Sequence, residues 1–121
     1  MTTARNRRFR FVPSRLDCLY VAELSDGRVK VGMTGMPKKR LTALLGSVAP
    51  LEMTRFFITD GLPCWRSHRA AEQHLIRRMR MMGRWTPGVG SEFFHGVPFR
   101  TALLEAECAQ QWFTATAEER A

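Results

Sequence analysis

Residues 18–34 read CLYVAELSDGRVKVGMT, and this stretch decides the fold. Two short apolar segments, 19–24 and 29–33, are joined by Ser25-Asp26-Gly27. An Asp-Gly pair between two such segments is a strong local indication of a hairpin, because it supplies the residues that tolerate positive φ in a tight turn. We therefore expect two paired antiparallel strands here.

The segments after this hairpin alternate between helical and strand-like patterns. Pro37 suits the first turn of a helix, and leucines recur at helical spacing as far as Gly46. Four further elements are expected: a strand over 51–59, a helix over 66–82, a brief strand over 92–94 and an amphipathic helix over 99–113. This order predicts an α+β fold with a small, mostly antiparallel sheet.

The length and the distribution of basic residues predict the domain organisation. The chain has 121 residues and a mass of 13.9 kDa, which is the size of one domain and excludes an enzyme with a separate cofactor module. We expect a basic N-terminal arm over 1–15, the domain itself over 16–95, and a C-terminal helical segment over 96–121 packed on that same domain.

The charge balance points to a partner rich in phosphate. Lysine and arginine number 19 against 11 acidic residues, which gives a net charge of +8, and 16 of the 19 are arginine. Guanidinium groups pair phosphates through two hydrogen bonds, so nucleic acid is favoured over a membrane. A basic surface that only keeps the chain soluble is the alternative.

Cysteine usage and hydropathy predict the compartment. Cys18, Cys64 and Cys108 stand far apart, with no histidine at zinc-ligand spacing from any of them, so we expect buried thiols and a reducing cytoplasm. No apolar run approaches the roughly 18 residues that a membrane span needs, and the arginine-rich start carries no apolar signal segment. Neither a signal peptide nor a membrane partner is expected.

Four residues have the chemistry of a phosphodiester site. Tyr20 and Lys30 lie on the two hairpin strands, where ten residues of separation can bring both side chains to one face. A tyrosine can orient or deprotonate a water, and a lysine can neutralise phosphate charge. Arg40, on the next helix, can bind phosphate oxygens, and Glu72, on the longer helix, can hold a divalent cation.

These positions also match the motifs of one nuclease family. The motifs are Cys18-Leu19-Tyr20, then Lys30-Val31-Gly32, then Arg40 within a Lys-Lys-Arg-Leu segment, and finally 70–76, which reads AAEQHLI. In these motifs and their order, over about residues 16–82, the chain resembles the GIY-YIG nuclease superfamily. The similarity reaches more loosely to 90–94, where one branch ends in Gly-x-Glu-aromatic-Phe.

The resemblance implies a fold and an activity. It implies a small three-stranded antiparallel sheet flanked by helices, and hydrolysis of DNA with a single Mg²⁺ or Mn²⁺ ion. Tyr20 then corresponds to the base or water-positioning tyrosine, Arg40 to the phosphate-binding arginine, and Glu72 to the metal ligand. Lys30 replaces the tyrosine of the second motif, as in a branch with many phage members.

Further basic residues are expected to contact nucleic acid. They are Lys38, Lys39, Arg77, Arg78 and Arg84, with Trp85 placed to stack on an unpaired base. Each residue taken alone is also what an ordinary solvated helix or loop would carry. The sequence leaves open the strandedness of the DNA and whether the chain has a protein partner or forms a homodimer.

Two other function classes remain beside the endonuclease. The late asparagine of several active family members has no counterpart, because Asn6 is the only asparagine in the chain. This absence favours a module that keeps the GIY-YIG-like fold and binds nucleic acid, or acts as a regulator or inhibitor, without cleaving. The third class is a protein-interaction domain that uses Trp65, Trp85 or Trp112 as anchors.

Overall fold

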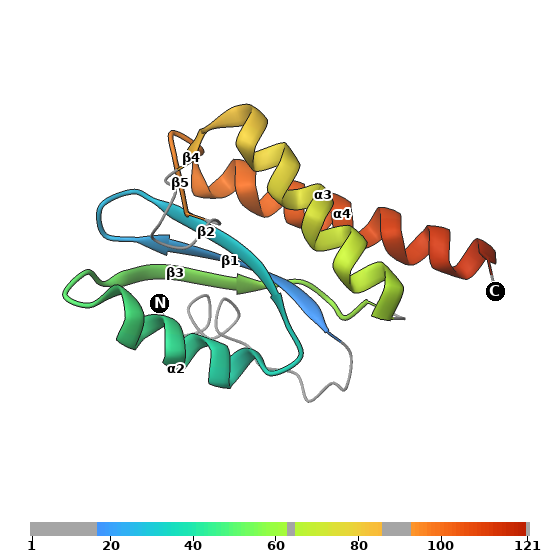
Figure 1. Cartoon of the computed structure of the whole chain (residues 1–121), viewed down its shortest axis with the longest axis horizontal. Coiled ribbons are helices and arrows are strands. Elements are labelled where there is room, and N and C mark those ends of the chain that lie inside the picture. The colour runs from blue at the N-terminus through green and yellow to red at the C-terminus, as the bar shows by residue number, and fades with distance from the viewer. Residues whose placement is uncertain (1–16, 63–64, 86–92, 121) are drawn as a thin grey trace.

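The computed structural model describes residues 17–62, 65–85 and 93–120, so the expected basic arm at 1–15 lies outside the described residues. The elements, in chain order, are β1 Cys18–Leu24, β2 Val29–Thr34, α2 Pro37–Val48, β3 Met53–Ile58, α3 Trp65–Met82, β4 Arg84–Trp85, β5 Phe93–His95 and α4 Phe99–Arg120 (Figure 1). The expected α+β class is confirmed.

The hairpin at the centre of the fold forms as its sequence predicts. β1 and β2 pair antiparallel, with Cys18 opposite Thr34 and Glu23 opposite Val29. Gly27 has a φ of 89°, the left-handed conformation that the turn requires. Asp26 closes the turn, because its Oδ1 accepts a hydrogen bond of 3.0 Å from the backbone N–H of Arg28.

The sheet has more strands than the resemblance implies. All its pairings are antiparallel and the order is β3-β1-β2-β5-β4, so the described residues form five strands where the resemblance implies three. β5 joins the outer edge of β2, where Val29 pairs with Phe94 and Lys30 with Phe93. The brief strand expected over 92–94 forms as β5, and its pairing accompanies the burial of Phe94, which is fully inaccessible.

Strand alternation sorts side chains to the two faces of the sheet, and Figure 1 shows α3 and α4 over one face and α2 over the other. The core between the sheet and the pair α3 and α4 includes Leu19, Val21, Val29, Val31, Leu75, Met79, Phe94, Ala102, Ala106 and Ala109. We call this side the α4 face. The other side, the α2 face, carries two smaller clusters around Tyr20, Phe56, Leu44, Val48 and Phe93.

Helix α4 departs from its expected pattern. It continues to Arg120 rather than ending near 113, and its buried stripe is built on Ala102, Ala106 and Ala109. Alanines let the helix lie close to the sheet, so larger residues turn outward. Cys108 is exposed, which corrects the expectation of a buried thiol there; Cys18 is buried as expected, and Cys64 lies outside the described residues.

Within the described ranges, no helix has the length and apolarity needed to cross a lipid bilayer.

Candidate functional site

Tyr20 lies across Gly32 at the centre of the α2 face. The two residues are directly opposite in the β1–β2 register. A Cβ atom at position 32 would be 2.6 Å from the Tyr20 hydroxyl oxygen and 2.7 Å from its Cζ atom. The ring also stacks on Phe56, with centroids 5.7 Å apart, and only 2% of the tyrosine is exposed. Glycine is therefore needed at position 32 because the tyrosine ring occupies the space of a side chain.

Lys30 shares this face because it is two residues from Gly32 along β2. Its strand partners are Ala22 on β1 and Phe93 on β5. The Lys30 Nζ atom lies 4.9 Å from the centroid of the Phe93 ring, a cation–π contact that holds the half-buried side chain over β5. The structure thus brings Lys30 and Tyr20 to the same face, as the sequence predicts.

Arg40 follows directly from the end of β2. The Thr34 hydroxyl accepts a 3.0 Å hydrogen bond from the backbone N–H of Met36, which turns the chain from the strand into α2. Lys38, Lys39 and Arg40 are exposed in the first turns of α2, whereas Leu44 is buried against the sheet. The helix therefore presents three cations at the end of the sheet where β2 ends.

Glu72 comes from the layer on the other side of the sheet. It is the only acidic residue in α3, and it is half-buried beside Ala71 and Leu75, which face the core of the α4 face. Spacing along the sequence cannot reveal this separation from Tyr20, because it carries no information on which face a helix will cover. Figure 1 shows α3 beginning near the end of the sheet where β2 leads into α2.

Part of the outer edge of β2 is not covered by a neighbouring strand. Along β2, β5 pairs with Val29 and Lys30 alone, so in the described part of the chain the outer edge from Val31 to Thr34 has no partner strand. The Tyr20 ring lies over Gly32 in this same stretch. Because α3 also contacts β2, this edge borders both layers.

The donor set allows one kind of metal site. Among the described residues, no group of three or more His, Cys, Asp or Glu side chains could hold a metal ion. Glu72 alone does not make a protein cage, but Mg²⁺ commonly binds through one or two carboxylates, keeping several waters and adding substrate phosphate oxygens. Glu72 fits this second arrangement.

The other residues expected to contact nucleic acid differ in how they are used. Arg77 is exposed on α3. Arg78 binds Glu105 of α4 through Nε and Nη2 at 3.0 and 3.2 Å, and these hydrogen bonds hold the pKa of Arg78 above its ordinary value. Arg78 therefore joins the two helices. The side chains of Arg84 and Trp85 lie outside the described residues.

Two residues of the α2 face were missed by the sequence patterns. Arg28 and Phe93 had no assigned role, although Arg28 precedes Lys30 by two residues and so must share its face. The Arg28 guanidinium carbon lies 5.4 Å from the centroid of the Phe93 ring. The period of two along β2 could have found Arg28, but nothing local could have paired Phe93 with it.

Comparisons of the chain with family models, with curated proteins and with solved structures find no match. The likeness to the GIY-YIG superfamily therefore rests on the residues of this chain alone.

Proposed function

We propose that this protein is a metal-dependent DNA endonuclease with a GIY-YIG-like fold and site. One observation carries the proposal: Tyr20 lies across Gly32, with Lys30 on the same face of the hairpin. The neighbouring start of α2 adds Arg40, so a tyrosine hydroxyl and two kinds of cation come from three adjoining elements. This combination suits a phosphate under attack by water.

Each residue has one task in this mechanism. Tyr20 orients the attacking water, and its stacking on Phe56 fixes the ring in place. Lys30 offsets the negative charge near that water, and Arg40 stabilises the charge that grows on the phosphate oxygens in the transition state. Glu72 would hold the divalent cation, which when bound polarises a phosphoryl oxygen and stabilises the leaving oxygen.

The decisive experiment removes the carboxylate of Glu72 and keeps its shape. Wild type, Glu72→Gln and Glu107→Gln are compared on single- and double-stranded DNA with Mg²⁺ or Mn²⁺ and with EDTA. Glu107 is a matched control, because it is a half-buried glutamate on the other helix of the same layer. We expect metal-dependent cleavage that falls roughly 10²–10³-fold in Glu72→Gln alone, with DNA affinity retained.

A second function is favoured by the position of Glu72. Because α3 covers the face opposite Tyr20, the basic α2 face could bind nucleic acid without any contribution from Glu72. DNA binding without cleavage in either metal would establish this non-cleaving module and overturn the nuclease. If the chain neither bound nor cleaved DNA, a protein partner would be the next function to test. Trp112, which is 61% exposed on α4, is the exposed anchor for such a partner in the described part of the chain.

A further inference from the structure

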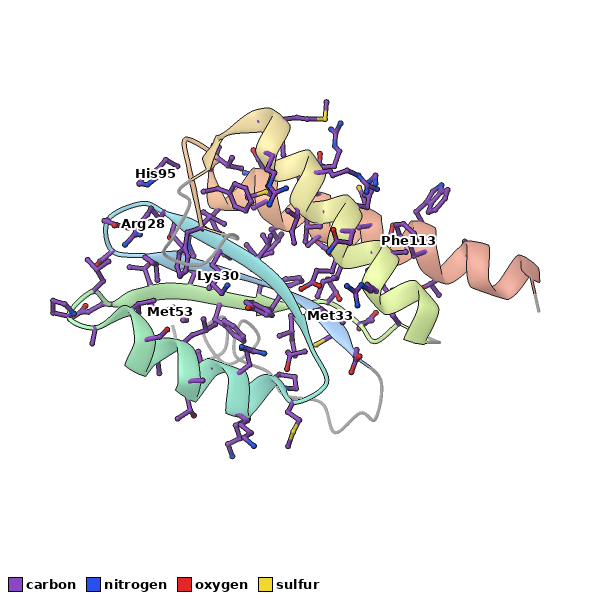
Figure 2. The ribbon with its side chains drawn as sticks, in the orientation of Figure 1. Arg28, Lys30, Met33, Met53, His95 and Phe113 are labelled. Carbon is purple, nitrogen blue, oxygen red and sulfur yellow. The ribbon has the colours of Figure 1, made fainter. Side chains whose placement is uncertain are left out.

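A second cation lies with Lys30 on the Phe93 ring. Arg28 precedes β2 and Phe93 belongs to β5, so two basic residues from one chain segment meet one aromatic ring on a neighbouring strand. Figure 2 shows Arg28 at the hairpin end of the sheet, with Lys30 further along β2. Alternation along β5 places His95, which is exposed, on the same face as Phe93.

The position of Arg28 is fixed before any ligand arrives. Its Nε donates a 2.7 Å hydrogen bond to Oδ2 of Asp26, and its guanidinium lies on Phe93. Partial burial acts to raise the pKa of Asp26, but the hydrogen bonds from Arg28 and the charges of Arg28 and His95 outweigh it and lower that pKa. Only 17% of the Arg28 side chain is exposed, so little conformational entropy remains to be lost on binding.

Part of the arginine fork stays available to a ligand. Among the described residues, Nε is the one guanidinium nitrogen of Arg28 that Asp26 contacts, and no side chain bonds the two Nη groups. A guanidinium offers five N–H donors in a planar arrangement that matches phosphate oxygens. The remaining donors of Arg28 are therefore of the kind that binds a phosphodiester.

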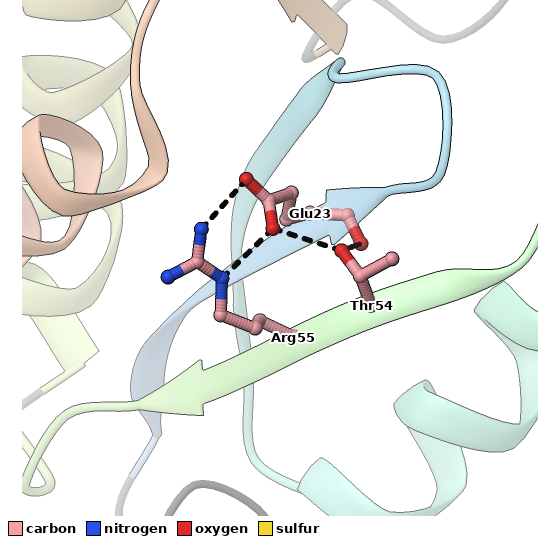
Figure 3. Close-up of polar contacts among 3 residues, drawn as sticks. All are labelled: Glu23, Thr54 and Arg55. Carbon is pink, nitrogen blue, oxygen red and sulfur yellow. Dashed lines mark hydrogen bonds and ion pairs between the residues drawn. The ribbon is translucent and has the colours of Figure 1, made fainter.

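A similar arginine on the α4 face is held through two of its three guanidinium nitrogens. Arg55 lies 4.5 Å from the centroid of Phe99, and Figure 3 shows it bound to Glu23 through two nitrogens. The Nε and Nη2 distances to the carboxylate oxygens are 2.8 and 3.0 Å, and Thr54 donates a further 2.8 Å hydrogen bond to Glu23. Arg55 thus shows the same ring contact in a purely structural pair.

We propose that Arg28 binds a backbone phosphate of the DNA strand that passes through the site at Tyr20 and Lys30. Residues 28, 30 and 32 follow each other on one face, and four residues of strand separate Arg28 from Gly32 by about 14 Å. The strand would leave the reaction site along β2 toward the hairpin turn, with its backbone held by Arg28. This inference rests on the proposed function, because the site at Tyr20 sets the other end of the path.

Binding without cleavage tests the inference directly. Polarisation of a labelled oligonucleotide in EDTA gives the affinity of wild type, Arg28→Ala and Arg55→Ala, with circular dichroism to show that each folds. We expect Arg28→Ala to bind roughly tenfold more weakly, and the slope of log affinity against log salt to fall by about 0.7–0.9, the loss of one phosphate contact. Arg55→Ala should bind as the wild type does.

Nuclear magnetic resonance supplies a readout that does not need cleavage or folding of a variant. The Nε–H signal of Arg28 should shift when inorganic phosphate or the oligonucleotide is added to the wild type, whereas that of Arg55 should not. Equal affinities of Arg28→Ala and Arg55→Ala, or an Arg28 signal that DNA does not move, would overturn the inference and leave the nuclease standing. An Arg28 signal that responds in a chain that cuts no DNA would support the phosphate site and overturn only the nuclease.

Discussion

On the α4 face, Arg55 lies over Phe99 and gives two guanidinium nitrogens to Glu23; on the α2 face, Arg28 lies over Phe93 and gives one guanidinium nitrogen to Asp26. The first face is closed by two helices over an apolar core. The second is covered by α2 near β3 and β1, and presents cations over β2 and β5. One alternating strand pattern therefore gives a large apolar core to one side of the sheet and cationic side chains over an aromatic ring to the other.

The sharpest way to test this difference is to remove neighbouring rings that point to opposite faces. Phe94 is fully buried on the α4 face, while Phe93 lies under Arg28 and Lys30. Phe94→Ala should lower the free energy of unfolding by about 3–5 kcal/mol, because it leaves a cavity in the core. Phe93→Ala should lower it by roughly 2 kcal/mol, because Phe93 belongs to a smaller cluster and its ring is covered by two cationic side chains instead of the main apolar core.

Urea denaturation measures both values on the same scale. Equal losses for the two variants would contradict the comparison, since they would mean that the two faces are packed equally well.

Stability at alkaline pH tests how completely the Cys18 thiol, at the start of β1, is excluded from water. Burial, and secondarily the charge of Asp17, raises the pKa of Cys18 from its ordinary value of 9.0 to about 11. A folded-state pKa above the unfolded value means that this thiol contributes its full stability below pH 9 and loses it as the pH rises to 11. We expect the free energy of unfolding to fall by about 2–3 kcal/mol between pH 9 and pH 11.

The measurement is the difference between wild type and Cys18→Ala in thermal melts at each pH, because other groups titrate in both. Cys108→Ala is the control, since that thiol is exposed on α4. A wild type and a Cys18→Ala variant that lose stability in parallel between pH 9 and 11 would show that the Cys18 thiol is open to water.

A smaller effect is expected from a methyl group at the site itself. In Gly32→Ala the new Cβ would meet the buried Tyr20 ring, which cannot move without disturbing Phe56 and α2. We expect the free energy of unfolding to fall by about 1–3 kcal/mol, which is the usual effect of overpacking. Gly46→Ala is the matched control in α2, where a Cβ meets nothing within 4 Å.

Because alanine is the better helix former, Gly46→Ala should stabilise the protein by roughly 0.5–1 kcal/mol, opposite in sign to Gly32→Ala. Chemical denaturation of both variants checks the signs. If Gly32→Ala were as stable as the wild type, the ring would not lie across position 32.

Local patterns in the sequence were enough for the hairpin and not for the edges of the sheet. Asp26-Gly27 determines a turn by itself, and the period of two then places Tyr20 and Lys30 on one face. The pairing of β5 with β2 depends instead on residues more than sixty positions apart, so the brief strand at 92–94 could be expected but its place beside β2 could not. The described residues form five strands, whereas the resemblance implied three.

The candidate site divides in the same way. The residue types and their order were visible from the sequence, including Gly32 as part of a motif. The reason for the glycine required the Tyr20 ring position, and the layer of Glu72 required the packing of α3 on the α4 face. Likewise, the exposure of Cys108 follows from an alanine stripe that only the packed helix reveals.

The contact between Tyr20 and Gly32 has a consequence for how this hairpin can change over generations. The two positions share one volume, so a bulkier residue at 32 becomes acceptable only once the ring at 20 has been lost. Substitutions at these two positions should therefore covary among related chains. Chains that keep the aromatic ring at position 20 would keep the glycine at position 32, and chains that lose the ring would tolerate other residues at position 32.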